Sequence, residues 1–142
     1  MKYFLSASFI FLIACSSAKK QADAKEPVGK GLKGTTWILS SFPGAKMETL
    51  KKPSTLHFSA TDNKMNGFSG CNGFGGQYTV EGTTLKMGSI LGTLKACMLG
   101  SQTEKTLYNV LNNTDHYKIS VGKLILLQGD KTLAEFTETK KE

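Results

Sequence analysis

The most unusual stretch of this 142-residue chain is Asn66-Gly67-Phe68-Ser69-Gly70-Cys71-Asn72-Gly73-Phe74-Gly75-Gly76-Gln77-Tyr78. Its glycines fit neither a P-loop nor a dinucleotide-binding motif, because the Gly-Lys-Ser/Thr ending and the required spacing are missing. Residues 67–70 are not a nucleophile elbow, which needs a glycine two residues after the serine. We therefore interpret the glycines as bends and bulges, with Phe68, Phe74 and Tyr78 filling a core around them.

Short β-strands are expected on both sides of this stretch, since β-branched, aromatic and alternating apolar residues are typical of strands. A hairpin is predicted where the turn at Glu81 and Gly82 joins two such runs. The last three strands should form an antiparallel meander. The predicted strand positions are 36–39, 56–58, 78–80, 84–87, 117–121, 123–127 and 132–136.

One helix of about three turns is predicted to begin at Ser101. Ser101 and Glu104 have the spacing of a capping box, in which each side chain would bond the other residue's backbone N–H. Leu107, Val110 and Leu111 follow at helical spacing and would form one apolar stripe against the sheet. Asn112 and Asn113 can end the helix. The expected class is α+β, mostly β.

The N-terminus has the pattern of an export signal. Lys2 precedes an apolar run over residues 3–14, and twelve helical residues span only about 18 Å of a bilayer core of roughly 30 Å. The run ends in Leu12-Ile13-Ala14-Cys15, which resembles the bacterial lipobox. That resemblance implies that residues 1–14 are a signal peptide and that Cys15 carries a diacylglyceryl group and acyl chains such as palmitate. An ordinary secretory signal is the alternative.

Composition divides the remaining chain into three parts. Residues 15–34 contain few large apolar groups and are expected to form a flexible, lipidated tether. Residues 35–138 are the expected domain, and residues 139–142 are a tail. In the sorting rule of some lipoproteins, an Asp after the lipidated cysteine retains the protein in the inner membrane. Ser16 follows Cys15 here, which favours the outer membrane facing the periplasm.

The formal net charge of +7 does not indicate nucleic-acid binding. The predicted tether carries +3, from five Lys and two acids, and residues 35–138 carry only +2, from ten Lys and eight acids. All 18 basic residues are Lys, whereas bidentate recognition of guanine and phosphate depends on Arg. We expect no nucleic-acid partner, and loose attraction of the tether to anionic lipid headgroups.

Cys71 and Cys97 remain once Cys15 takes lipid, and a cysteine pair in an exported domain predicts a disulfide. It would close a loop of about 25 residues and stabilise the fold by roughly 3.5 kcal/mol. The alternative is a metal site built from Cys71, Cys97, His57 and His116. The absence of a CxxC pair and the wide separation of the histidines disfavour it, so neither a metal nor another cofactor is expected.

The chain contains, in this order, the motifs Thr36-Trp37, Leu56-x-Phe58, Gly70-Cys71-Asn72-x-Phe74-x-Gly76-x-Tyr78, Thr93-x-x-Ala96-Cys97 and Glu104. Together these motifs resemble the META domain family, also called the HslJ or heat-shock-protein-HslJ-like family. The resemblance covers about residues 34–138 and departs from the family at Lys95, where Met usually precedes Ala-Cys. It implies a small, partly open antiparallel β-barrel with one helix packed across it.

The resemblance also implies a non-enzymatic envelope lipoprotein connected with heat or antibiotic stress, which binds an unknown envelope protein or lipid. A monomer is expected. The alternative is a carrier or pilot that holds an acyl chain or apolar peptide inside the half-barrel. Its cavity would be lined by Leu111, Leu124, Leu126 and Phe136, and it would fail if these side chains pack tightly.

A hydrolase is the third hypothesis, and it requires a nucleophile, a base and an orienting group. Only His57 and His116 could be histidine bases. Both are expected at the surface, His57 on the outer face of its strand and His116 at a strand start, so no catalytic residue is predicted.

Overall fold

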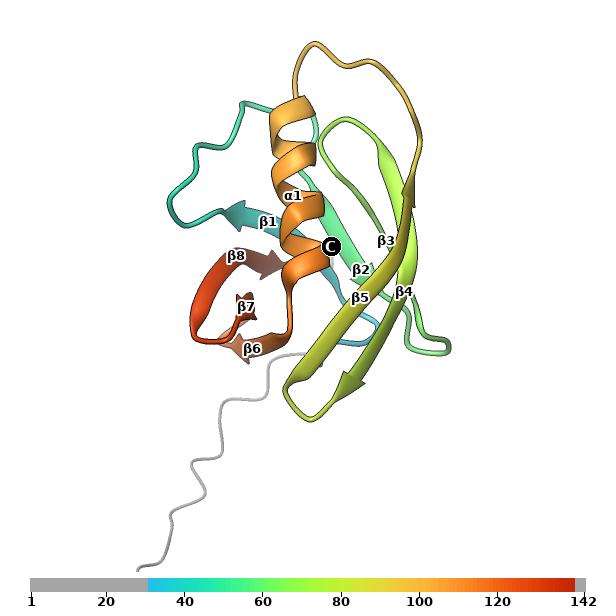
Figure 1. Cartoon of the computed structure of the whole chain (residues 1–142), viewed down its shortest axis with the longest axis vertical. Helices are drawn as coiled ribbons and strands as arrows, with labels where there is room; N and C mark the ends of the chain where they lie inside the picture. The colour runs from blue at the N-terminus through green and yellow to red at the C-terminus, as the bar shows by residue number, and fades with distance from the viewer. Residues whose placement is uncertain (1–30, 140–142) are drawn as a thin grey trace, which may run out of the picture.

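The structure is a computed structural model, and it describes residues 31–139. These residues form a ring of eight antiparallel strands with one helix, α1, between the fifth and sixth strands (Figure 1). The expected mostly β barrel with one helix is confirmed. The elements are β1 (Thr36–Ser41), β2 (Thr55–Phe58), β3 (Lys64–Phe68), β4 (Gly73–Glu81), β5 (Thr84–Gly92), α1 (Ser101–Asn113), β6 (His116–Ser120), β7 (Lys123–Gln128) and β8 (Lys131–Glu138).

The ring closes where β1 pairs with β8 and is weakest between β5 and β6. Only Thr84 and His116 are register partners there, and the Leu85 N–H donates to the Asp115 carbonyl at 2.9 Å. The Tyr117 N–H also donates to the Thr83 carbonyl at 3.0 Å, and the helix α1, which follows β5 in the chain, packs against β5. The helix buries Leu107 and Leu111 completely, so its apolar stripe completes the core at the incomplete seam.

The strand and helix predictions hold, with one large exception in the glycine-rich stretch. The hairpin at Glu81 and the β6–β7–β8 meander are present. However, β3 was not predicted, and β4 begins at Gly73 rather than near Tyr78. Glycine has a low strand propensity, which hides these strands from sequence patterns. Bends were expected at several glycines of this stretch, but Gly70 is the only one of them with a positive φ. The pairing of β4 with β5 also shifts register between Gly75 and Gln77.

A glycine is required inside β3 because other groups approach the backbone closely. A Cβ placed on Gly67 would lie 2.1 Å from the Thr55 carbonyl oxygen and 2.6 Å from the Phe74 ring. Such contacts are one reason for glycine within a strand. Phe74 and Tyr78 are buried as expected, whereas Phe68 is only half-buried.

The folded domain begins before residue 35 and extends past residue 138. Leu32 is buried in the core, and the Gly34 N–H donates to the Phe58 carbonyl at 2.8 Å. Thr139 donates from its N–H to the Thr36 carbonyl at 3.0 Å. The boundaries 15–34 and 139–142 therefore need correction, because burial of Leu32 and backbone pairing at both ends join these residues to the barrel. Cys15 and the predicted signal peptide lie outside the described residues.

Across residues 31–139 no helix has both the length and the apolar character needed to cross a membrane.

Candidate functional site

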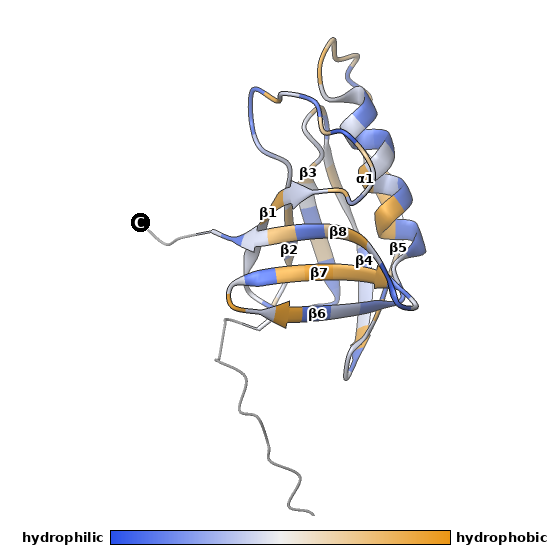
Figure 2. Cartoon of the chain, turned by 90° about the vertical axis from the view of Figure 1, so that its left-hand side faces the viewer, coloured by the Kyte–Doolittle hydropathy of each residue, from blue (hydrophilic) through white to orange (hydrophobic). Residues whose placement is uncertain are grey.

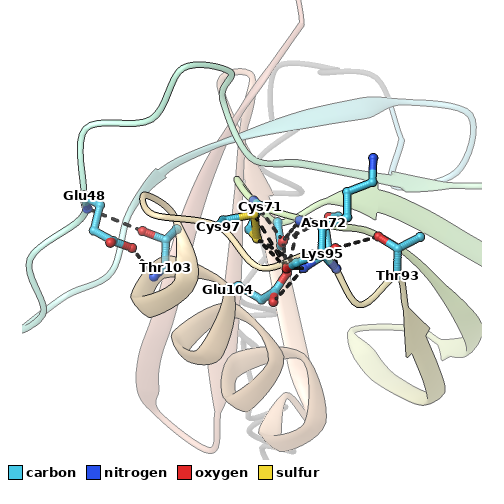
Figure 3. The surroundings of a disulfide bond; sticks show 9 residues. Glu48, Cys71, Asn72, Thr93, Lys95, Cys97, Thr103 and Glu104 are labelled. Atoms are coloured by element: carbon cyan, nitrogen blue, oxygen red, sulfur yellow. Dashed lines mark hydrogen bonds between the residues drawn. A yellow bond between two sulfur atoms is a disulfide. The ribbon is translucent and has the colours of Figure 1, made fainter.

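A disulfide joins Cys71, in the turn between β3 and β4, to Cys97, in the long loop between β5 and α1. The two Cα atoms are 5.8 Å apart (Figure 3). This pairing is the one that the sequence predicts. It leaves neither thiol for the alternative metal site, and residues 31–139 contain no group of three His, Cys, Asp or Glu side chains placed to hold a metal ion.

The Asn72 side chain fastens the same loop by hydrogen bonds. Its Oδ1 accepts from the Thr93 hydroxyl at 2.6 Å and from the Lys95 N–H at 2.9 Å, and its Nδ2 donates to the Lys95 carbonyl at 3.2 Å. Asn72 is almost fully buried, so these bonds form away from water. The Asn72 amide therefore bonds both the N–H and the carbonyl of Lys95, as the backbone of a neighbouring strand would.

We call the place where the β3–β4 turn, residues 93–97 and the start of α1 meet the junction. Glu104, in the first turn of α1, connects the helix to it. One carboxylate oxygen accepts from the Asn72 N–H and the other from Asn72 Nδ2, both at 3.2 Å, and the Ser69 hydroxyl also donates to the group. The predicted capping box is therefore wrong. Gly100 is the N-cap and has no side chain that could form a capping bond. The Glu104 carboxylate is turned toward Asn72.

Glu48, in the loop between β1 and β2, supplies the helix with the acceptor that Ser101 does not. Its carboxylate accepts from the Thr103 N–H at 2.8 Å (Figure 3). This bond satisfies one of the free N–H groups of the first helical turn. It also lowers the pKa of Glu48, with desolvation opposing the shift.

Two glycine backbones meet at the centre of the junction. A Cβ on Gly100 would lie 2.6 Å from the Gly70 carbonyl oxygen, and one on Gly70 would lie 2.7 Å from the Leu50 side chain. Both glycines have left-handed φ values, +100° at Gly70 and +92° at Gly100. The contact brings the start of α1 against the β3–β4 turn.

The loop held in this way exposes apolar side chains to solvent. Leu94 is 100% exposed, Met98 99% and Leu99 50%, and Leu91 at the end of β5 is also exposed. Figure 2 shows this loop in the colour of apolar residues at its tip, beyond the start of α1. Exposed apolar patches on folded proteins often mark interaction surfaces.

A hollow of about 790 Å³ lies beside the disulfide at the base of the loop. Its lining combines apolar groups with three lysines: Lys51, Lys52, Phe68, Gly70, Cys71, Lys95, Cys97, Met98 and Leu99.

The four residues predicted to line an internal apolar cavity do not do so. Leu111, Leu124, Leu126 and Phe136 are each fully buried in one core cluster. Their close packing removes the site that the carrier hypothesis placed inside the barrel. The hollow lies outside the barrel wall instead.

The two histidines lie on separate strands, and each bonds to a neighbouring polar group. His57 on β2 contacts the Thr36 hydroxyl through Nδ1 at 3.1 Å and is half-buried rather than fully exposed. His116 is exposed at the start of β6, as predicted, and its Nδ1 lies 2.7 Å from Asp115 Oδ1. This contact and the Gly129 N–H lower the pKa of Asp115.

Sequence reasoning missed the exposed loop and its lysine partners. The visible signal was the apolar pair Met98-Leu99, which belongs to no strand or helix pattern. Lys51 and Lys52 gave no such signal, because only the tertiary fold brings the β1–β2 loop beside residues 95–99.

Comparison with solved structures identifies the same fold in other proteins. An NMR structure of a protein from Burkholderia xenovorans matches with a TM-score of 0.64 and 26% identity, over 78% of this chain and 85% of that one. A crystal structure of a DUF4847 family protein from Bacteroides vulgatus matches with a TM-score of 0.55 and 16% identity, over 76% and 94% of the two chains. The second likeness concerns the fold alone.

A search of curated proteins finds no match. A family model, that of the META domain, matches residues 30–141. The match includes the Cys71–Cys97 pair, Asn72 and Glu104, whose contacts hold the loop in place. The chain is a member of the META domain family.

Proposed function

We propose that this protein is a non-enzymatic, lipid-anchored protein of the bacterial envelope, with a binding role under heat or antibiotic stress. The observation that carries the binding role is the loop over residues 93–99. A disulfide and the Asn72 side chain hold this loop in place, although it exposes Leu94 and Met98 almost completely. Exposed apolar groups contribute nothing to folding while they remain in water, so a fixed loop that presents them favours recognition.

The hydrogen bonds of the polar groups at the junction favour a structural role for these groups. Asn72, Glu104 and the Ser69 hydroxyl are bonded to one another and to loop backbone. The histidine rings lie elsewhere, against Thr36 and Asp115. This arrangement favours binding over hydrolysis.

Anchoring at Cys15 to the outer membrane, on the periplasmic side, completes the proposal. The test is mass spectrometry of the protein purified from membranes of its source bacterium. We expect the chain to begin at an acylated Cys15, and a Cys15→Ala variant to stay unacylated and to leave the membrane fraction. An unacylated wild-type chain would overturn the anchor, and recovery with the inner membrane would overturn the location.

The stress role is tested by deleting the gene and challenging cells with heat and with antibiotics. We expect sensitivity that the wild-type gene restores and that a Leu94→Ser/Met98→Ser gene does not, because that protein lacks the apolar loop surface. Equal growth of deletion and wild-type strains would contradict this role.

The hollow beside the disulfide favours the second candidate, a carrier of an apolar ligand, at a site different from the one first expected. Its volume of about 790 Å³ falls in the range of small-molecule sites, roughly 300–1,000 Å³.

A further inference from the structure

The hollow beside the disulfide has an apolar floor. Phe68 at the end of β3, the Cys71–Cys97 bridge, Met98 and Leu99 line it. One side of an alkyl chain that lies against these groups would be removed from water, and the free energy gained is proportional to the apolar area covered. The bridge and the Asn72 contacts hold residues 93–97 against the β3–β4 turn before any ligand arrives, and preformed sites lose less entropy on binding.

The rim of the hollow is positively charged. Lys51, Lys52 and Lys95 line it and are exposed, and within residues 31–139 none of them has an ion-pair partner. The acids on the adjoining elements point elsewhere, since Glu48 accepts from the Thr103 N–H and Glu104 from Asn72. Figure 3 shows the Lys95 side chain leading away from the contacts that its backbone makes with Asn72.

We propose that this hollow binds a single-chain anionic amphiphile, such as a long-chain carboxylate. The alkyl tail would lie on Phe68, the disulfide and Met98, and the anionic head would face the three lysines. The proposal deepens the proposed binding role by naming the class of ligand. An apolar floor below a cationic rim complements this molecule in both of its parts, whereas a neutral or cationic head would lose the electrostatic contribution.

The hollow lies at the end of the barrel that is opposite to the start of the described chain. The described chain starts near the opposite end of the barrel, where Lys33 lies beside Glu81 and Thr84 (Figure 1). The hollow adjoins the other end of β4, and nine strand residues span about 27 Å. The hollow and the start of the described chain therefore lie at opposite ends of the barrel.

The test uses the unacylated chain from Ser16 to Glu142, which contains the complete barrel. Sodium dodecanoate, kept below its micelle concentration, is titrated by calorimetry and by amide NMR. We expect saturable 1:1 binding, with shifts concentrated at residues 51–52, 68–71 and 95–99. Dodecyltrimethylammonium and dodecyl maltoside should bind at least about fivefold more weakly, and binding of dodecanoate should weaken with salt. Acetate, which lacks the tail, should not bind.

Two surface variants separate the tail from the head. Lys51→Gln/Lys52→Gln should weaken dodecanoate binding about fivefold to tenfold and flatten its salt dependence. Met98→Ser should weaken dodecanoate and dodecyl maltoside alike, by about tenfold or more. The matched controls are Lys118→Gln/Lys123→Gln and Val121→Asn, which lie on exposed positions of β6, β7 and their turn and should change nothing. All these side chains are exposed, so folding should survive.

Four results would overturn the proposal: no saturable binding of dodecanoate, equal binding of the three amphiphiles, equal effects of the control variants, or shifts away from the hollow. Cosedimentation with phosphatidylglycerol vesicles in the absence of dodecanoate binding would assign the surface to a bilayer instead. Any of these failures leaves acylation of Cys15 and the deletion phenotype unaffected, so the proposed function and this inference fail separately.

Discussion

The Asn72 side chain donates to Glu104 Oε1 at 3.2 Å and thereby joins the β3–β4 turn to the first turn of α1. The opposite side of the same amide accepts from the loop before that helix, at the Lys95 N–H. One buried side chain therefore positions three segments that are distant in sequence. The adjacent disulfide and the Gly70–Gly100 contact restrain the same place, which explains how a loop with exposed apolar residues stays fixed.

Asn72→Ala should lower the free energy of unfolding by about 2–4 kcal/mol, because the Lys95 N–H and the Thr93 hydroxyl lose their acceptor. Urea unfolding measures this as a lower midpoint at an unchanged slope. Asn66→Ala, at an exposed position of β3, is the matched control and should change stability by less than about 0.5 kcal/mol. Equal effects of the two substitutions would contradict the role assigned to Asn72.

The Cys71→Ser/Cys97→Ser variant should unfold at a free energy lower by about 2–4 kcal/mol, because the unfolded chain is no longer cross-linked. Hydrogen exchange should accelerate over residues 93–99 while β7 and β8 stay protected. A thiol assay on the unreduced chain from Ser16 should find no reactive thiol. Two reactive thiols in that assay would show that the bridge is absent.

Gly100→Ala should destabilise the domain more than Gly122→Ala does. Both glycines have left-handed φ values, but a Cβ on Gly100 would lie 2.6 Å from the Gly70 carbonyl oxygen, whereas a Cβ on Gly122 would point into open space. The pair separates steric overlap from the cost of left-handed backbone, which is of order 1 kcal/mol for alanine. Thermal unfolding gives the comparison, and equal shifts in Tm would argue against close contact between the two backbones.

Glu48→Gln should destabilise the protein at neutral pH but not at strongly acidic pH. The Thr103 N–H holds the pKa of Glu48 in the folded protein below its ordinary value of 4.5. The charged carboxylate therefore contributes stability above that ordinary value, and the contribution is lost as the pH falls through the lowered pKa. Unfolding of wild type and variant between pH 2 and 7 measures the difference.

Glu48→Asp retains the charge but shortens the side chain, and it should resemble Glu48→Gln if the bond to Thr103 matters. The role assigned to Glu48 would be contradicted if the difference in unfolding free energy between wild type and Glu48→Gln grew as the pH fell.

The sequence predicted best those elements whose side chains alternate or recur at helical spacing. The β6–β7–β8 meander and the stripe of Leu107, Val110 and Leu111 were recognisable because each has one apolar face directed at the core. The disulfide followed from cysteine count and predicted export. By contrast, β3 and most of β4 could not be recognised, because Gly67 and Gly76 are required where a carbonyl oxygen of another strand approaches closely, and glycine has a low strand propensity.

The site shows the same division. Asn72 and Glu104 belong to the motifs that resemble the META domain, yet their bond to each other depends on how the β3–β4 turn meets α1. Local spacing instead suggested that Glu104 closes a capping box with Ser101, and the tertiary contact prevailed because Asn72 offers it two donors in a buried setting.

Residue pattern alone determined the β-rich class, the single helix and the cysteine pair, since these depend on periodicity and counting along the chain. Only the folded barrel decided that Leu111, Leu124, Leu126 and Phe136 fill the interior and that the hollow lies outside beside the disulfide. The physical reason is that packing density and the meeting of distant loops depend on three-dimensional distances between residues such as Lys51 and Met98, which no local pattern encodes.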